Sequence, residues 1–404
     1  MLFAMGLEPF TRDSTIFQDE NVLRDSHTPQ TLIERDEELM AYQSALRPVV
    51  NGAQPKNLFL YGQTGVGKTL ATKLVLERLS TDLESMKDVD LHTVFLNCKS
   101  LSSSYQVAAN LINEFRQPDD KIKTTGYPTG MINQMLWDHL NDLEATHCLI
   151  VLDEVDSIGN DDDILYQVPR ANDNNLVEST QIGVIGISND FTFRDNLSAR
   201  VKDSLCDEEI LFSPYDANQL RRILEQRSGK AFHEDVLDEN VIPLAAAFAG
   251  QSSGSARQAL RRLYKAGDLA RDEDAEIVTE RHVREADRAV ERDKVWEELL
   301  RVPTHSKLTL YALLVLEAED KLPAKRSAIY KRYRIAANQI DIDPRTDRTV
   351  HDRLSQLTLK GFLDVEEKNK GPKGGSYYQY QFSIRSELVT EALSEDSRAR
   401  DLFE

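Results

Sequence analysis

The sequence predicts an α/β fold with a parallel sheet, followed by an all-α segment and a C-terminal winged helix. Five apolar, strand-like runs alternate with helical segments up to Phe212. This alternation is typical of a parallel sheet covered by helices on both faces. From Asp216 to Arg292 only amphipathic helices are predicted, and the remaining helices end in a β-hairpin with a basic tip.

The predicted strands of the sheet are Asn57–Tyr61, His92–Asn97, Cys148–Leu152, Ile182–Ser188 and Glu209–Phe212. A helix over Leu32–Leu46 is predicted before the first strand. A second helix, Leu70–Leu79, follows that strand, with Leu70, Leu74, Val75 and Leu79 expected on one side. The segment Asp161–Asn175 is rich in Asp and Asn and is predicted to be an exposed loop.

The turn after the first strand carries a complete phosphate-loop pattern. It reads Gly62-Gln63-Thr64-Gly65-Val66-Gly67-Lys68-Thr69 between a strand and a helix, which is the context that the pattern requires. Backbone N–H groups of such a loop converge on phosphate oxygens at a helix N-terminus. The pattern predicts that Lys68 reaches the β- and γ-phosphates of a nucleoside triphosphate and that Thr69 binds Mg²⁺. The alternative is a chance Gly-rich turn.

A second motif bears on hydrolysis. The apolar run from Cys148 to Leu152 ends in Asp153 and Glu154. Carboxylates at the end of a buried parallel strand lie where open α/β sheets bind ligands. We predict that Asp153 holds Mg²⁺ and that Glu154 orients or deprotonates the attacking water. The alternative is a solvated acidic loop.

Composition limits the remaining classes. No apolar stretch reaches about 18 residues and no signal peptide is evident, so we expect a cytoplasmic protein without a membrane partner. Cys98, Cys148 and Cys206 show no metal or disulfide spacing and are expected to be buried thiols. The net charge of −19 favours a halophilic protein adapted to high salt, although acidic mesophilic proteins are an alternative.

The charge distribution separates a C-terminal domain. Residues 296–385 carry 16 basic and 12 acidic side chains, a net of +4, so the rest of the chain carries −23. This asymmetry indicates a different partner for the C-terminal part. The predicted organisation is listed by residue numbers: an N-terminal tail 1–20, an α/β base 21–214, a helical lid 215–292, a winged helix 293–390 and a C-terminal tail 391–404.

The winged helix is predicted from the order of its elements. These are helices over Lys307–Glu317, Ala324–Ala337 and Asp347–Lys360 and strands over Phe362–Glu367 and Tyr377–Ile384. In the third helix, Val350, Leu354 and Leu357 are expected to pack inward. The predicted contacts with double-stranded DNA are Arg348, Arg353, Gln356 and Lys360 from the helix and Lys370 and Lys373 from the wing. A protein–protein module is the alternative.

Three further segments extend the pattern. Asn189 ends the fourth strand, Arg200 follows in Leu197–Leu205, and Arg257 lies in the first turn of a predicted lid helix, Ser255–Leu269. Together with the two nucleotide motifs, this order resembles the AAA+ ATPases, and within them the archaeal and eukaryotic origin-recognition and replication-licensing initiators. The resemblance covers roughly residues 17 to 385, including an entry segment, Ile16–Leu23, and an adenine-side box, Ile33–Leu39.

The resemblance implies roles for individual residues. Asn189 would be the first sensor of the γ-phosphate, Arg257 the second sensor, and Arg200 an arginine finger for a neighbouring subunit. Arg35, Leu70 and Tyr215 would belong to the nucleotide site. The alternatives are a strand-end cap for Asn189 and surface salt bridges for the two arginines. Ser255 stands where the family usually has an acidic residue, and Asp203 stands where it usually has Ser.

The resemblance also implies a function. The chain would bind origin duplex DNA, help to recruit the replicative helicase and use ATP binding with slow hydrolysis as a switch, at the nucleoid and with possible self-association on DNA. A family insertion that grips DNA would fall within Arg116–Gly130, with Lys121 and Lys123. The alternatives are a clamp-loader or transposition-type ATPase that acts on a protein partner, and a DNA-binding regulatory paralogue with little turnover.

Overall fold

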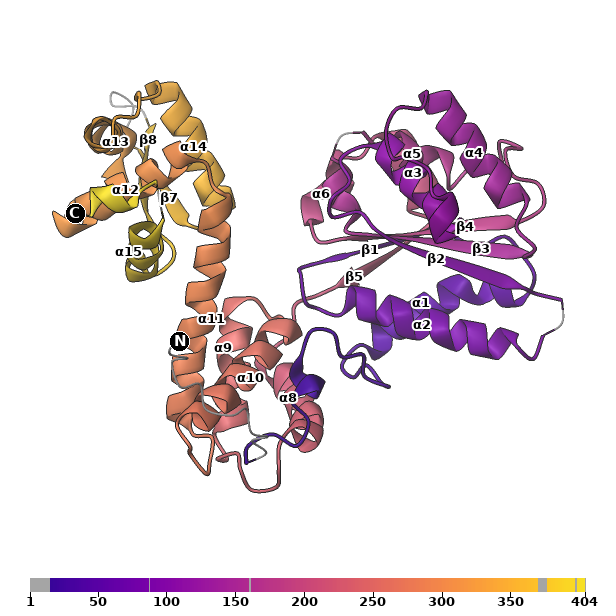
Figure 1. Cartoon of the computed structure of the whole chain (residues 1–404), viewed down its shortest axis with the longest axis horizontal. Coiled ribbons are helices and arrows are strands. Elements are labelled where there is room, and N and C mark those ends of the chain that lie inside the picture. Colours follow the sequence, from indigo (N-terminus) through magenta and orange to yellow (C-terminus); the bar gives the residue numbers. More distant parts are fainter. Residues whose placement is uncertain (1–14, 87, 160, 370–375, 397, 404) are drawn as a thin grey trace, which may run out of the picture. The chain divides into compact units, whose positions relative to one another are not determined.

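The computed structural model describes residues 15–86, 88–159, 161–369, 376–396 and 398–403. The chain forms two compact units, with the division between Ala286 and Asp287. The first unit contains a parallel sheet and a set of helices, and the second contains helices and a small antiparallel sheet (Figure 1). Among the described residues, no helix has both the length and the apolarity needed to cross a membrane.

A five-stranded parallel sheet is the centre of the first unit. Its strands are β1 (Leu58–Gly62), β2 (Leu91–Asn97), β3 (His147–Asp153), β4 (Gln181–Ser188) and β5 (Glu208–Phe212), in the order β2-β3-β4-β1-β5. Each begins and ends within one residue of its predicted bounds. β3 and β4 are buried almost throughout, because a strand covered on both faces needs apolar residues at every position.

Helices cover both faces of this sheet (Figure 1). α1 (Asp36–Val50) and α2 (Lys68–Leu83) lie on one face, and α3 (Ser104–Glu114), α4 (Thr129–Asn141) and α5 (Asp163–Gln167) lie on the other. α6 (Phe191–Asn196) and α7 (Ala199–Leu205) connect β4 to β5. The strand order brings the C-terminal ends of β1, β3 and β4 together, which is where such sheets bind ligands.

The segment after β3 corrects one prediction. Asp161–Asn175 is not simply an exposed loop, because it contains α5 and buries Ile164, Leu165 and Val168 against the core. Ser104, at the start of α3, binds this segment through its backbone N–H and its hydroxyl, which bond Asp161. The few apolar residues among the Asp and Asn residues therefore determine the structure of the segment.

The first two helices differ from their predicted positions. α1 begins at Asp36 rather than Leu32 and runs on to Val50. In α2 the buried side includes Ala71, Leu76 and Leu79, whereas Leu70 and Leu74 are only half-buried. Leu79, predicted on the same side as Leu70 and Leu74, is buried, and the helix begins at Lys68, two residues before its predicted start.

Arg35 precedes α1 and is a buried strut, with 3 % of its surface exposed. Its guanidinium donates to the carbonyl oxygens of Val66 at 3.2 Å and Ser213 at 2.5 Å, and it forms an ion pair with Glu38. These contacts connect the start of α1 with the phosphate loop and with the end of β5.

Helices α8 (Ala217–Ala231), α9 (Val241–Ser252) and α10 (Ala256–Asp272) follow the sheet and form the predicted all-α part. The N-terminal segment packs on them: the rings of Phe17 and Phe232 lie 4.9 Å apart, and Ile16 is fully buried. The predicted tail 1–20 is therefore packed from Ile16 on, and residues 1–14 lie outside the described part. The short 3-10 helix η1 (Glu20–Leu23) continues this contact. α11 (Glu280–Arg301) contains the division between the units.

The second unit is a winged helix. Its elements are α12 (Thr304–Ala318), β6 (Ala324–Lys325), α13 (Arg326–Gln339), α14 (Asp347–Leu359), β7 (Leu363–Asn369), β8 (Ser376–Phe382), α15 (Ser386–Glu395) and a 3-10 helix, η4 (Arg400–Leu402). The strands form an antiparallel sheet in the order β6-β8-β7. Val350, Leu354 and Leu357 of α14 are buried, as predicted.

The predicted C-terminal tail 391–404 is also corrected. Leu393, Ala399 and Leu402 are buried in the core of the second unit. Asp396 forms a buried ion pair with Lys307 of α12, and their side chains are 10 % and 7 % exposed. Burial raises the pKa of the Asp396 carboxyl, but hydrogen bonds from Lys307 and from backbone N–H groups outweigh burial and hold that pKa below its ordinary value.

Replacing Arg35 by Met is expected to lower the free energy of unfolding of the first unit by about 3 kcal/mol, because two buried carbonyl groups and Glu38 lose their partner. The measurement is urea unfolding followed by the fluorescence of Trp137, which is buried in this unit, in a Trp296→Phe background. The matched control is Arg222→Met, which removes a half-exposed ion pair with Glu34 and should change stability by less than about 1 kcal/mol. Equal effects of the two variants would contradict the role of Arg35 as a strut.

Replacing Lys307 by Met is expected to lower the free energy of unfolding of the second unit by about 3 kcal/mol, because it leaves the buried Asp396 carboxylate without its counter-charge. Trp296, which packs against the core of this unit, reports unfolding in a Trp137→Phe background. The loss should be complete at neutral pH and should shrink as the pH falls through the lowered pKa of Asp396. Lys321→Met, at an exposed ion pair with Glu319, is the control, and a similar loss there would refute the prediction.

Candidate functional site

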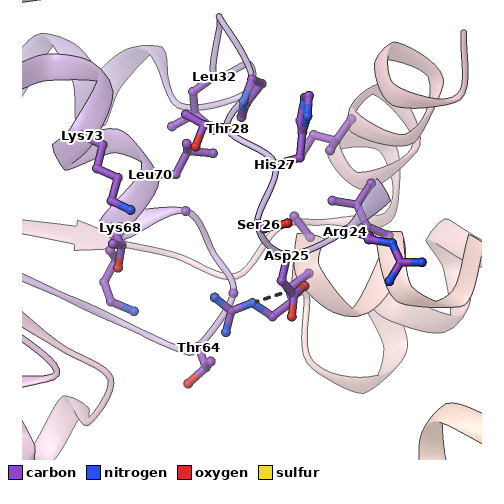
Figure 2. A pocket seen from close by; sticks show the side chains of 18 of the residues that line it. Arg24, Asp25, Ser26, His27, Thr28, Leu32, Thr64, Lys68, Leu70 and Lys73 are labelled. Atoms are coloured by element: carbon purple, nitrogen blue, oxygen red, sulfur yellow. Dashed lines mark ion pairs between the residues drawn. The ribbon is translucent and has the colours of Figure 1, made fainter. Parts of the chain in front are cut away.

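The first unit contains a cavity of about 370 Å³ at the C-terminal ends of the strands. Its wall is formed by the phosphate loop, the segment 24–33, α8 and α10. Figure 2 shows Lys68, Leu70 and Lys73 of α2 and Thr64 of the loop facing the segment from Arg24 to Leu32 across this space. The cavity residues therefore come from parts of the sequence that lie far apart, from Arg24 to Leu260.

Most of the predicted nucleotide residues lie in this wall. They are Thr64, Gly65, Gly67, Lys68, Thr69, Leu70, Asp153, Glu154, Asn189, Tyr215 and Arg257. Gly62, Gln63 and Val66 belong to the same loop but do not line the cavity. Arg35 and Arg200 are outside the wall.

Two glycines of the loop allow a close approach of other segments. Gly65 has φ +82°, and a Cβ at this position would lie 2.2 Å from the Ser255 hydroxyl oxygen. A Cβ on Gly62 would lie 2.3 Å from the carbonyl oxygen of Phe212. Both distances are shorter than any van der Waals contact, so these positions require glycine. The loop is thereby packed against the start of α10 on one side and the end of β5 on the other.

Lys68 is a buried cation in the middle of the loop, with 4 % of its surface exposed. Its ammonium donates to the carbonyl oxygens of Gly62 and Gln63, both at 2.8 Å, and to Oδ1 of Asn189 at 2.9 Å. Burial lowers the pKa of Lys68 to about 8, against the opposing effect of the nearby carboxylates. The Asn189 side chain thus meets the phosphate loop directly.

Oxygen ligands suitable for Mg²⁺ lie next to Lys68. The Thr69 hydroxyl donates to Oδ2 of Asp153 at 3.0 Å, and Oδ1 of Asp153 accepts from the N–H of Glu154. Mg²⁺ is commonly held by one or two such protein groups together with nucleotide phosphates. The described residues contain no cluster of three or more His, Cys, Asp or Glu able to hold a metal alone.

The ends of β3 and β4 are connected to each other. Glu154 adopts a left-handed backbone conformation, with φ 55° and ψ 42°, which is uncommon outside glycine. Asp156, two residues on, accepts the backbone N–H of Asn189 at 2.9 Å. The strained turn therefore places Asp156 where it fixes Asn189, while Glu154 remains in the cavity wall.

Arg257 lies beside the loop, in the first turn of α10. Its guanidinium is 3.8 Å from Asp25, which also pairs with Arg261 at 2.6 Å. The dashed line to Asp25 in Figure 2 marks the first of these ion pairs. Ser255 caps α10 by accepting the N–H of Gln258, so serine serves as the cap where the family usually has an acidic residue.

Arg200 is half-exposed on α7. It forms an ion pair with Asp163 of α5 and lies 5.2 Å from the ring centre of Tyr166. Its structural partner is therefore Asp163 rather than Asp203, the residue whose presence departs from the family pattern. The guanidinium does not line the cavity of its own chain.

Several cavity residues were missed by sequence reasoning. Asn97 ends β2 beside Asp153, and its polar side chain at a strand end was an available signal. Lys73 lies one helical turn beyond Thr69, and this spacing of four residues was a signal that the two side chains share one face of the helix. The contribution of Arg227 from α8 and of the segment 24–31 carries no sequence signal, because it depends on tertiary packing.

The candidate DNA-binding residues lie on α14 and at its end. Arg348, Gln356 and Lys360 are exposed, and Arg353 is half-buried. Arg353 donates to the side-chain oxygen of Gln356 at 2.8 Å, and Lys360 lies 3.5 Å from a Glu298 carboxylate oxygen. Lys370 and Lys373 lie outside the described residues.

The predicted insertion, Arg116–Gly130, leads into α4. Its Lys121 and Lys123 are both exposed. The Asn113 side chain of α3 holds the segment by accepting the N–H of Ile122 and donating to its carbonyl oxygen.

Comparisons with known proteins agree with this architecture. Family models match in chain order: an AAA domain at residues 52–189, a Cdc6 AAA+ ATPase-type lid domain at 221–288, and a CDC6 C-terminal winged helix domain at 297–392. The chain is 67% identical to ORC1-type DNA replication protein 1 of Haloarcula marismortui, over 99% of this chain and 97% of that protein. It is 36% identical to the ORC1-type DNA replication protein of Thermococcus kodakarensis, over 98% and 95%.

A solved structure is similar over nearly the whole length. The Aeropyrum pernix ORC1 protein, determined in complex with DNA, has a TM-score of 0.82 and 34% identity, over 97% of this chain and 100% of that one. The halophilic relatives agree with the salt adaptation predicted from the acidic composition. The matched models also identify the nucleotide-binding unit as an AAA+ ATPase. The chain belongs to the ORC1-type, Cdc6-related family of DNA replication proteins.

Proposed function

We propose that this chain is an ATP-dependent DNA replication initiator that binds origin duplex DNA and helps to recruit the replicative helicase. ATP binding and slow hydrolysis would act as its switch. The observation that carries the proposal is the convergence of Lys68, Thr69, Asp153 and Asn189 on one cavity, in a chain that also has a winged helix. The proposed place of action is the nucleoid, in the cytoplasm.

The chemistry of the cavity suits nucleotide hydrolysis. Lys68 would exchange its backbone acceptors for the β- and γ-phosphate oxygens of ATP. Thr69 and Asp153 would hold Mg²⁺, which neutralises charge on the phosphates. Glu154, in the wall beside Asp153, would orient or deprotonate the attacking water. Mg²⁺ itself would supply only charge stabilisation.

The two sensor roles are proposals supported by geometry. Asn189 bonds the Lys68 ammonium, so a γ-phosphate bound to Lys68 would be within reach of its side chain. Arg257 would add positive charge from α10, beside Gly65. Binding and loss of the γ-phosphate would therefore change the contacts at the end of β4, through Asn189, and at the start of α10, through Arg257.

Arg200 is proposed to act on a neighbouring subunit's nucleotide, because its half-exposed guanidinium is outside the cavity of its own chain. Such an arginine can be supplied in trans, which would couple hydrolysis to self-association on DNA. The predicted domain bounds are retained as proposals with two exceptions: residues 16–20 pack on the helices of the lid, and the winged-helix domain should extend to at least Leu402.

The DNA interface is proposed on α14 and the wing. Arg353 and Gln356 are bonded to each other, and both side-chain types can read purine edges in the major groove. Arg348, Lys360, Lys370 and Lys373 would contact phosphates. Lys121 and Lys123 would give a second basic contact from the first unit.

Replacing Lys68 by Ala is expected to abolish Mg-ATP binding, because the buried cation that meets the phosphates is lost. Replacing Glu154 by Gln should keep ATP binding and reduce hydrolysis by ~10²–10⁴. The measurements are equilibrium binding of ATP and single-turnover phosphate release. Glu77→Gln, an exposed carboxylate change on α2, is the control and should alter neither. Equal losses of binding in the Lys68 and Glu154 variants would contradict the role of Glu154.

Replacing Arg353 by Ala is expected to cost ~1–3 kcal/mol of binding at preferred duplex sites if it reads a base. The double change Lys370→Ala and Lys373→Ala should weaken binding to all sequences. It should also flatten the salt dependence by roughly 0.9 log units per lost phosphate contact for each tenfold rise in salt. Fluorescence anisotropy with an origin duplex and a scrambled duplex measures both effects.

The control for DNA binding is Arg78→Ala, an exposed helix charge in the first unit that pairs with Asp82. It should leave duplex affinity unchanged. If the Arg353 and wing variants bind DNA as well as the unchanged protein at every salt concentration, the winged helix would instead be assigned to a protein partner.

A further inference from the structure

Arg227 of α8 is a buried arginine to which the described residues supply no counter-charge. Only 7 % of its surface is exposed, and its Nη1 atom has no hydrogen-bond partner among the described residues. Burial is the cause that lowers the pKa of its guanidinium, and no carboxylate acts against it. A buried charge without a partner destabilises a fold, so such a residue requires an explanation.

Arg227 lines the same cavity as the phosphate loop. Within that cavity its charged neighbour is His27, whose pKa is lowered by burial and then by Arg227. The charged groups that act on the pKa of Lys68 are different ones, namely Asp153, Asp156, Arg257 and Glu154. In Figure 2, His27 and Lys68 lie on different sides of the cavity. Arg227 is therefore at the end away from the phosphate loop.

That end of the cavity suits the base and sugar of a nucleotide. Ile223, one helical turn before Arg227 on α8, is an apolar residue of the cavity wall, and Leu32, Ile33 and Leu260 add further apolar surface to that wall. Apolar walls fit the faces of a base, whereas ring nitrogens and ribose oxygens require hydrogen-bond donors. A guanidinium supplies donors in a fixed plane and stays charged at physiological pH.

We propose that Arg227 is a nucleotide contact, which donates from α8 to acceptor atoms on the base or sugar of the nucleotide bound at the phosphate loop. The inference rests on the proposed nucleotide site and adds a residue to it. Arg227 would connect bound nucleotide to α8, whereas Arg257 would connect it to α10. The helical part of the unit would then hold the nucleotide at both ends.

Arg262 of α10 provides a matched comparison. It is also a buried arginine of this helical part, 2 % exposed, but it donates to the carbonyl oxygen of Gln258 and to Ser252. It does not line the cavity. Removing Arg262 breaks structural contacts, whereas removing Arg227 removes an unpaired buried charge. The two substitutions should therefore have opposite signatures in stability and binding.

The experiment compares Arg227→Met, Arg227→Lys and Arg262→Met in the full chain. Calorimetric titrations with ATP and ADP give affinities, and thermal unfolding without nucleotide gives stability. Arg227→Met should lose about tenfold to a hundredfold in affinity, by the same factor for ATP and ADP, as expected for a hydrogen bond to a charged group. Its unfolding midpoint should equal or exceed that of the unchanged protein. Arg227→Lys should lose less affinity, and Arg262→Met should lower the midpoint with affinity kept within about twofold.

Analogues distinguish the two acceptors. 7-Deaza-ATP lacks a ring nitrogen and 2′-deoxy-ATP lacks a sugar oxygen; the analogue that lacks the contacted atom should bind the unchanged protein more weakly than ATP does, and Arg227→Met should not discriminate against it. Unchanged affinity in Arg227→Met, a loss confined to ATP, or a lowered midpoint with normal affinity would overturn the proposal. If the unchanged protein itself bound no ATP, or Lys68→Ala bound it equally well, the proposed nucleotide site would fail instead.

Discussion

The buried ammonium of Lys68 connects the parts of the first unit on which the site depends. It bonds two carbonyl groups of its own loop and the side chain of Asn189 at the end of β4. These contacts are possible only because the sheet order places β1 next to β4 and β4 next to β3. Thr69, one residue on, bonds Asp153 at the end of β3. One turn of backbone thus relates three strand ends, and a displacement of any strand would disturb all of these contacts.

The many charges of the chain differ in what they contribute. Most ion pairs, such as Arg78–Asp82 and Lys321–Glu319, are largely exposed and contribute little even at low salt. In molar salt the Debye length falls to ~3 Å, which weakens them further. The buried groups differ, because Arg35 and the Lys307–Asp396 pair are shielded from salt. An acidic surface and a few buried ion pairs therefore have separate roles, the first in solubility and the second in fixing the structure.

The sequence predicted the sheet and the phosphate loop well, for a physical reason. Buried parallel strands must be apolar throughout, so a run such as Cys148–Leu152 can be recognised as a strand from the sequence alone. The same reasoning failed for Asp161–Asn175, where three apolar side chains among polar residues form a helix against the core. It also failed at the C-terminus, where Asp396 is buried only because Lys307 lies opposite. The composition around Asp396 cannot indicate an ion-pair partner that is 89 residues away in the sequence.

Within the candidate site, too, residues in local motifs were predictable from the sequence, whereas residues placed by tertiary packing were not. Lys68, Thr69 and Asp153 follow from motifs, because phosphate and Mg²⁺ binding restrict both residue type and spacing. Arg35 was assigned to the nucleotide site by resemblance, but the structure puts its guanidinium between the loop, Ser213 and Glu38, outside the cavity wall. Arg227 attracted no attention in the sequence, since one more arginine in a charged helix carries no signal. Only its burial without a partner distinguishes it from its neighbours.

The N-terminal segment shows why the cavity has its composition. Phe17 packs against Phe232 beside Gly267, where a Cβ would lie 2.4 Å from the Phe17 ring. Farther along, Asp25 pairs with Arg257 and Arg261 of α10, and residues 24–33 line the cavity before the chain enters α1. The segment is therefore anchored on the helices at one end and on the sheet at the other. A nucleotide in the cavity would contact residues 24–33, which connect the helices to the sheet. Loss of a phosphate from that nucleotide would therefore change the contacts of a segment that is fixed at both ends.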